Sequence, residues 1–180
     1  GPRTGFPKKP MMPHNLPMTV TGAAMLWVGW FGFNGGSALG ANGDAASALV
    51  VTQISAATAT LVWMFVEWAK HGKPSMLGAA TGAIAGLAAI TPASGSVGPV
   101  GALVIGALSG FICWWASTVL KLKLGYDDSL DVFGVHGVGG FIGTIMLGVF
   151  MAPAFGGVGG EGFSIGKQLG VQLFAAAVTA

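Results

Sequence analysis

The chain has 180 residues, of which only 8% are charged and 53% are hydrophobic, and its net charge is +2. Soluble domains carry about 25% charged residues, so this composition excludes an ordinary soluble domain. The 32 glycines have no Gly-X-Y period and lie among large apolar residues, which excludes collagen and disorder. No basic cluster with interleaved aromatic residues points to nucleic acid. We therefore predict an all-α polytopic membrane protein.

Runs without charge place the membrane spans, because a span needs about 20 mostly apolar residues. We expect five complete spans and a truncated sixth, over residues 18–39, 45–69, 75–91, 98–121, 132–152 and 166–180. Asp44 and Ser75 are predicted to cap helix N-termini, and Pro153 is predicted to stop a helix. The chain opens without Met and closes in an apolar stretch, so we expect a piece of a longer protein.

The basic residues predict the orientation of the spans. Seven of the eight lie on alternate connections: Arg3, Lys8 and Lys9, then Lys70 and Lys73, then Lys121 and Lys123. Lys167 alone falls on the opposite side. By the positive-inside rule, residues 1–17, 70–74 and 121–131 are predicted to be cytoplasmic.

Small-residue spacing predicts how the helices pack. GxxxG patterns, which let helix backbones approach closely, occur in four predicted helices: Gly32/Gly36, Gly78/Gly82/Gly86, Gly106/Gly110 and Gly139/Gly143. Glycine is also simply more frequent in membrane helices. The patterns therefore favour a compact bundle and say nothing about a substrate.

His136 is the candidate functional residue of the fifth expected span, in the sequence DVFGVHGVGG. An ionisable group inside a span is costly, so a functional role is favoured over a histidine that only bonds a neighbouring helix. Neutral imidazole donates at one nitrogen and accepts at the other, which suits proton relay or pore lining. His14 and His71 lie in expected turns and are interpreted as surface residues. With Cys113 as the single cysteine, neither a metal site nor a cofactor is predicted.

The sequence WFGFNGGS places aromatic side chains and a hydroxyl at the outer end of the first expected span. Phe33 and Ser37 are one helical turn apart, so they point the same way. Together they could hold a small cation by a cation-π contact and a hydrogen bond. Trp27 and Trp30 also fit an interfacial aromatic belt.

Two acidic residues near expected helix ends receive structural interpretations. Asp131 is a candidate N-cap, and Glu67 is expected to reach the interface or a lysine. No P-loop, dinucleotide fingerprint, HExxH motif, serine elbow or carboxylate pair within a span occurs, so an enzyme is not predicted.

Five motifs in this order resemble the second half of the ammonium transporter family: PHNLPM, GWFGFNGGS, EWAKHGKPS, LGAATGAIAGLAAITPASG and DDSLDVFGVHGVGG. The resemblance runs from Pro13 to Gly170. It implies an eleven-helix fold of two inverted five-helix repeats, of which this chain holds helices six to ten and the start of eleven. Residues 1–17 would then be a cytoplasmic connection, and residues 18–180 a partial transporter domain.

The resemblance also assigns candidate site residues. Phe33 resembles the family's gating phenylalanine, and Ser37 resembles the hydroxyl that holds ammonium at the outer vestibule. His136 resembles the second of the family's twin pore histidines, and Thr91 a pore-side threonine. The structural positions near the pore are Asn34 and Asp131.

The implied function is transport of ammonium across the plasma (inner) membrane, with ammonia passing an apolar pore while histidine relays the proton. The implied partners are ammonium or ammonia, the lipid bilayer, two further copies in a homotrimer, and a nitrogen-regulatory signal protein on the cytoplasmic face. Two other functions stay open: a water or neutral-solute channel without proton movement, and an ammonium sensor.

Overall fold

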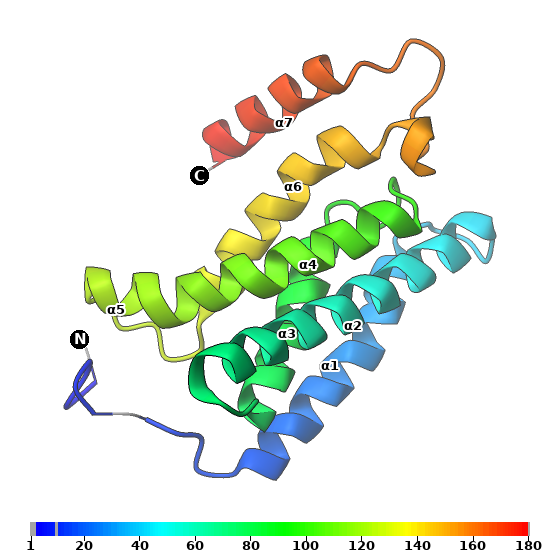
Figure 1. Ribbon diagram of the computed structural model, residues 1–180. Helices are drawn as coiled ribbons and strands as arrows, with labels where there is room; N and C mark the ends of the chain where they lie inside the picture. The colour runs from blue at the N-terminus through cyan, green and yellow to red at the C-terminus, as the bar shows by residue number, and fades with distance from the viewer. Residues whose placement is uncertain (1–2, 10, 180) are drawn as a thin grey trace.

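The computed structural model describes residues 3–9 and 11–179, and helices are the regular elements of this part of the chain. The predicted ranges 1–17 and 18–180 therefore include four residues, 1, 2, 10 and 180, that lie outside the description. The elements in chain order, shown in Figure 1, are α1 (Leu16–Gly36), α2 (Gly43–His71), α3 (Met76–Ile90), α4 (Pro99–Trp115), η1 (Ala116–Leu120), α5 (Lys121–Leu124), η2 (Val132–Gly137), α6 (Val138–Phe150), η3 (Pro153–Phe155) and α7 (Ile165–Thr179).

Four helical stretches are long and apolar enough to cross a membrane: Leu16–Gly36, Gly43–His71, Pro99–Leu124 and Val132–Phe150. The third joins α4, η1 and α5 into one continuous helix. Five complete spans were expected, but α3 is shorter than a complete span. It has only 15 residues and rises about 22 Å. A turn at residues 91–96 ends it, where the sequence TPASGS follows.

Side-chain caps fix where three of these helices begin. The Asn15 side chain accepts from the Met18 N–H of α1 at 3.0 Å, and the predicted cap Ser75 accepts from the Gly78 N–H of α3 at 2.8 Å. The predicted cap Asp44 is wrong, because the Asn42 side chain caps α2 two residues earlier. The acid instead lies in the first turn, where its charge favours the helix dipole. As predicted, α6 ends just before Pro153.

Glycine seams join α2, α3 and α4 into the core. A Cβ atom built on Gly86 of α3 would lie 2.5 Å from the Ser55 carbonyl oxygen of α2, and one on Gly106 of α4 would lie 2.6 Å from the same atom. The Ser55 hydroxyl also donates to the Gly86 carbonyl at 2.9 Å. These glycines let three backbones meet at one residue, as the GxxxG pattern predicts. Gly32 and Gly36 of α1 differ, because nothing lies within 4 Å of their Cβ positions.

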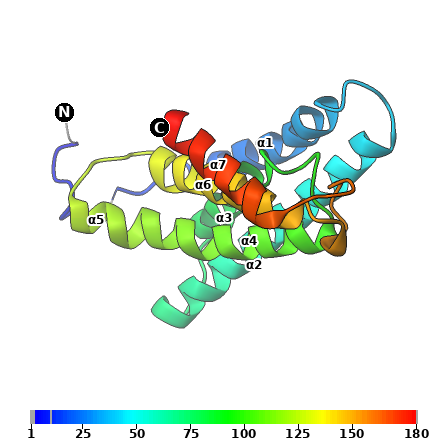
Figure 2. The ribbon, with the colours of Figure 1, turned by 90° about the horizontal axis from the view of Figure 1, so that it is seen from above.

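The first and last helices lie on the outside of this core. Figure 2, seen from above, shows α7 lying across α6, and the glycine at position 148 lets the Leu169 backbone approach α6 closely. Helix α1 packs with one side against α2 and α3. None of its most hydropathic 18-residue stretch is buried, so the other side of α1 is open.

Candidate functional site

The Trp30 side chain of α1 brings together the residues that the sequence singled out. Its indole nitrogen donates to the Thr91 hydroxyl at 2.7 Å, just past the end of α3. On its other side the indole stacks on the imidazole of His136, with ring centroids 6.4 Å apart and planes inclined by 15°. One side chain therefore holds the pore-candidate threonine and histidine in a fixed relation, although they come from separate elements.

Phe33 and Ser37 continue this arrangement towards the end of α1. The Phe33 ring meets the Trp30 indole edge-on, with centroids 6.2 Å apart and planes at 87°. The Ser37 hydroxyl donates to the Phe33 carbonyl at 2.8 Å, which uses its proton. The serine oxygen is then left with lone pairs that can accept, and both side chains are exposed. The ring and the oxygen thus offer the two features that a small N–H cation needs.

Two adjoining apolar hollows run along the open side of α1. The first has a volume of about 680 Å³ and the second about 290 Å³, and they share Gly22 and Leu26 in their linings. Trp30 and Phe33 line the first, and His136 lines the second. Of the described residues that line the two hollows, His136 is the one with a titratable side chain. The His136 imidazole thus borders hollows that are otherwise lined by uncharged, mostly apolar residues, and we call the two hollows together the α1 groove.

A π-helical segment places His136 at the wall of the α1 groove. It lies in η2, and its backbone continues without a break into α6. The glycine at position 134 makes the close approach possible, since a Cβ atom there would meet the Ser117 side chain and backbone of η1. Such π segments are rare and are frequently found at functional sites. The His136 side chain itself is exposed to the groove.

Asn34 lies outside the groove. It is buried between α1 and α2, where its amide nitrogen donates to the Thr52 hydroxyl at 2.9 Å. That hydroxyl donates in turn to the Ala48 carbonyl at 2.6 Å. This short chain of hydrogen bonds fixes the rotation of α1, and so supports the direction in which the neighbouring Phe33 points.

The Asp131 side chain does not make the predicted capping hydrogen bond. It occupies the position before η2 in the left-handed backbone region, at φ 53°, and its side chain makes no cap. It pairs instead with Lys121, whose ammonium also donates to the Asp128 carbonyl. The Asp128 carboxylate takes over the capping, accepting from the Phe133 N–H at 2.8 Å. The loop before η2 is thus held by the charged side chains of Lys121, Asp128 and Asp131.

A second ion pair ties the start of the chain to the same loop. The Arg3 guanidinium donates to the Asp127 carboxylate, with Nη2 to Oδ1 at 2.6 Å and Nε to Oδ1 at 2.9 Å. The bond from the Arg3 side chain, and then the one from its backbone N–H, hold the pKa of Asp127 below its ordinary value. Burial, with the Asp128 and Asp131 charges, raises the pKa of Tyr126 beside them.

Glu67 pairs with Ser75, so the predicted lysine partner is wrong. Its carboxylate accepts from the Ser75 N–H at 2.7 Å and from the Ser75 hydroxyl at 3.1 Å. It also lies where a Cβ atom on Gly78 would be. The acid therefore satisfies the start of α3, where an isolated carboxylate complements the helix dipole.

Trp30 is the site residue that the sequence interpretation missed, because an interfacial belt explains a tryptophan near a span end equally well. A signal was present in the spacing. Residues 22, 26, 30, 33 and 37 recur at three or four positions apart, so they share one face of α1. The helical period, applied from Phe33 backwards, places Trp30 in the same groove.

The fold and site define a helical integral membrane protein with an apolar, histidine-bearing groove. Compared with known proteins, the chain matches the profile of the Ammonium Transporter Family over residues 1–180. The chain belongs to this family, and the resemblance seen in its motifs is confirmed.

Individual relatives agree with this assignment. The chain is 49% identical over 179 residues to ammonium transporter Amt1 of Archaeoglobus fulgidus, a match covering 99% of this chain and 45% of the relative. It is 47% identical over 163 residues to an ammonium transporter of Aquifex aeolicus, covering 91% and 38%. The chain thus spans about two fifths of the length of these curated relatives.

Solved structures show the same fold. Candida albicans Mep2 superposes with a TM-score of 0.84 at 39% identity, over 95% of this chain and 39% of that structure. A structure titled "Sensor Amt Protein" superposes with a TM-score of 0.83 at 34% identity, over 92% and 40%.

Proposed function

We propose that this chain forms part of a membrane path for ammonium, which the aromatic and hydroxyl groups at Phe33 and Ser37 recruit. Ammonia then passes the α1 groove, and His136 relays the proton. The observation that carries the proposal is the series of ring contacts from Phe33 through Trp30 to His136 along the α1 groove. The printed names of the relatives as ammonium transporters support the substrate.

The chemistry of the groove favours splitting ammonium into ammonia and a proton. Moving a small cation into hydrocarbon-like surroundings costs of order 20 kcal/mol in the idealised Born limit. The described lining of the groove offers no carboxylate to offset that cost. A neutral imidazole can take the proton at one nitrogen and release one at the other. Potassium has no proton to give up, so the same groove excludes it.

Trp30 and Thr91 support this path by holding its parts in place. The Thr91 hydroxyl donates to the Leu87 carbonyl at 2.7 Å and accepts from Trp30, so both of its main hydrogen-bonding directions are used. The threonine therefore positions the indole, and the indole fixes the imidazole plane. In this proposal Thr91 acts on the groove indirectly, by orienting Trp30.

The family's repeat architecture gives this chain its place in the whole transporter. We infer that α1, α2, α3, α4 with its extension, and η2 with α6 are helices six to ten, and that α7 begins helix eleven. The open side of α1 then faces the other repeat, because transport paths form between inverted repeats. The plasma membrane, the cytoplasmic residues 1–17, 70–74 and 121–131, the homotrimer and a cytoplasmic nitrogen-regulatory partner belong to the same proposal.

A hybrid transporter tests the function. The matching segment of the Archaeoglobus fulgidus transporter is replaced by this chain, and methylammonium uptake and current are recorded together in proteoliposomes. Uptake with a coupled current, at a level near that of the parent, is the expected result. Uptake without current contradicts the proton relay and supports a neutral-solute channel. A hybrid that inserts normally but takes up nothing contradicts transport.

Sensing is the second candidate, favoured by the structural neighbour titled "Sensor Amt Protein". A sensor binds ammonium at the outer end of the groove without passing it on. In the same vesicles it would show saturable ammonium binding with neither uptake nor current. That result would move the assignment from transport to sensing.

A further inference from the structure

Arg3 ties the segment before α1 to the loop before η2, and the Asp127 carboxylate accepts from three of its nitrogens. These donors are the main-chain N–H, Nε and Nη2. The Asp127 side chain is only 8% exposed, and the Arg3 side chain is 34% exposed. Exposed ion pairs contribute little in general, but a carboxylate that is shielded from water and bound by two guanidinium nitrogens is an exception. The contact is therefore a strong tie between two distant parts of the chain.

The residue after Asp127 makes the cap of η2. The Asp128 carboxylate accepts from the Phe133 N–H at 2.8 Å, in the first turn of η2. The Asp128 carbonyl accepts from the Lys121 ammonium at 3.3 Å. One end of the loop is thus bound to Arg3, and the adjoining residue is bound to the helix that carries the groove histidine.

The residue directly before η2 has a backbone conformation that needs support. Asp131 lies in the left-handed region at φ 53°, which a non-glycine residue keeps only where its surroundings hold it. Its carbonyl accepts from the Val135 N–H at 2.8 Å. Val135 is buried and directly precedes His136. The conformation of Asp131 therefore helps to set the rotation at which η2 presents the imidazole.

We propose that Arg3 is a positioning residue for the proton relay, acting through Asp127 and the loop on the His136 imidazole. This role rests on the proposed function. Without the tie the loop is free to move at Asp127, and η2 can rotate so that the imidazole leaves its stack on Trp30. Proton transfer needs hydrogen-bonding distance, and a displacement of about 1 Å at a reacting group can cost about 100-fold in rate.

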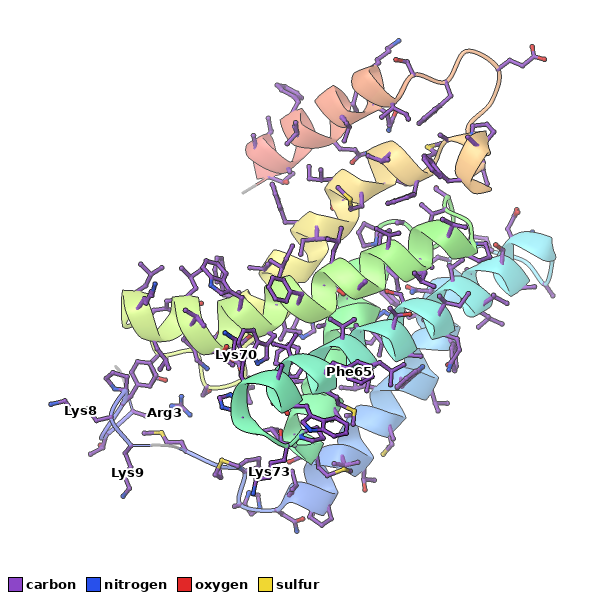
Figure 3. All side chains as sticks on the ribbon, in the orientation of Figure 1. Arg3, Lys8, Lys9, Phe65, Lys70 and Lys73 are labelled. Atoms are coloured by element: carbon purple, nitrogen blue, oxygen red, sulfur yellow. The ribbon has the colours of Figure 1, made fainter. Side chains whose placement is uncertain are left out.

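Two exposed lysines supply matched controls. Lys8 lies in the same segment as Arg3, and Lys123 lies in α5 just before the loop. Within residues 3–9 and 11–179, neither lysine has a carboxylate within 4.0 Å. Figure 3 shows Arg3 on the side of its segment nearer to the helices, with Lys8 and Lys9 pointing away from them. Lys8→Gln and Lys123→Gln remove a charge from the same two elements without touching the tie.

The test reads His136 directly by nuclear magnetic resonance, in the hybrid transporter with isotope-labelled histidine. The Trp30 indole stacks on the imidazole, so its ring current shifts the His136 ring-proton resonance, which is identified by its loss in His136→Ala. Arg3→Gln and Asp127→Asn are each expected to move this resonance. Each is also expected to lower the charge moved per methylammonium taken up, by about 10- to 100-fold. A change that only impairs folding lowers current and uptake together and leaves their ratio unchanged.

The control and double variants complete the test. Lys8→Gln and Lys123→Gln are expected to keep both the resonance and the ratio of current to uptake. Arg3→Gln combined with Asp127→Asn is expected to resemble Asp127→Asn alone, because residues that act as one unit are not additive. A double variant that loses as much as the two single losses combined shows separate roles and overturns the proposal.

The two readouts separate this role from the proposed function. An unmoved His136 resonance in Arg3→Gln overturns the positioning role and leaves transport intact. A moved resonance with an unchanged ratio of current to uptake overturns the role in the relay. A resonance that moves in Arg3→Gln, in a hybrid that carries no current even when unmodified, supports positioning of the imidazole by Arg3 and contradicts the proposed function.

Discussion

Replacing Gly106 by alanine tests whether the core depends on backbone contact between helices. The new Cβ atom would lie 2.6 Å from the Ser55 carbonyl oxygen, about 0.8 Å short of the 3.4 Å at which ordinary contact begins. Helix α2 cannot simply recede, because Gly86 of α3 touches the same carbonyl from the other side. Overpacking of this kind costs about 1 to 3 kcal/mol.

Gly140→Ala is the matched control for this change. Nothing lies within 4 Å of the Cβ position of Gly140, so this alanine adds only its better helix propensity, worth up to about 1 kcal/mol. Both variants gain that propensity, so the difference between them isolates the overpacking. We expect Gly106→Ala to have the lower free energy of unfolding by about 1 to 3 kcal/mol. Unfolding by sodium dodecyl sulfate in mixed micelles, followed by circular dichroism, measures it. Equal free energies of unfolding in the two variants would contradict close backbone contact at Gly106.

Three further perturbations test other contacts. Ser55→Ala removes one interhelical hydrogen bond and is expected to cost about 0.6 kcal/mol in the same unfolding assay; a cost above that of Gly106→Ala would contradict this ranking of the two contacts. Glu67→Ala removes the acceptor for the Ser75 N–H and is expected to speed amide exchange in the first turn of α3. Glu67→Gln keeps an acceptor, so the same amides are expected to exchange more slowly than in the alanine variant. Arg3 lowers the pKa of Asp127 from 3.8, so the ion pair persists above that pH and is lost as the pH falls through the lowered pKa. Backbone relaxation of residues 3–9, measured against pH, reports the loss of the pair. The same pH dependence in Asp127→Asn would contradict the assignment of the transition to this pair.

The helix positions and the glycine seams were predictable because they follow from local patterns. Charge-free runs placed every long helix within three residues, since hydropathy and helix length are properties of the chain itself. Gly106 and Gly110 were predicted as a packing face, and the structure confirms it through close approach to α2. The α1 pair Gly32 and Gly36 was predicted from the same pattern, but nothing described lies against it. A GxxxG pattern therefore identifies a possible seam and does not identify its partner.

The polar contacts were harder to predict because they depend on which elements meet. Asp131 has the sequence context of a cap, yet Lys121 lies near enough to take its carboxylate. Glu67 was expected to reach the interface or a lysine, and its carboxylate accepts from Ser75 at the start of the next helix. Trp30 has its place in the site through the contact of its ring with His136 of η2. In each case a partner on another element outweighed the local preference.

The measurement that tests the central claim most directly is the ammonium-evoked current of the hybrid transporter carrying His136→Ala. His14→Ala is its matched control, because His14 is exposed in the segment before α1 and lies outside the groove. The account predicts that His136→Ala loses the current or its exclusion of potassium, while His14→Ala keeps both. Unchanged current and unchanged potassium exclusion in His136→Ala would contradict the claim that this imidazole relays the proton.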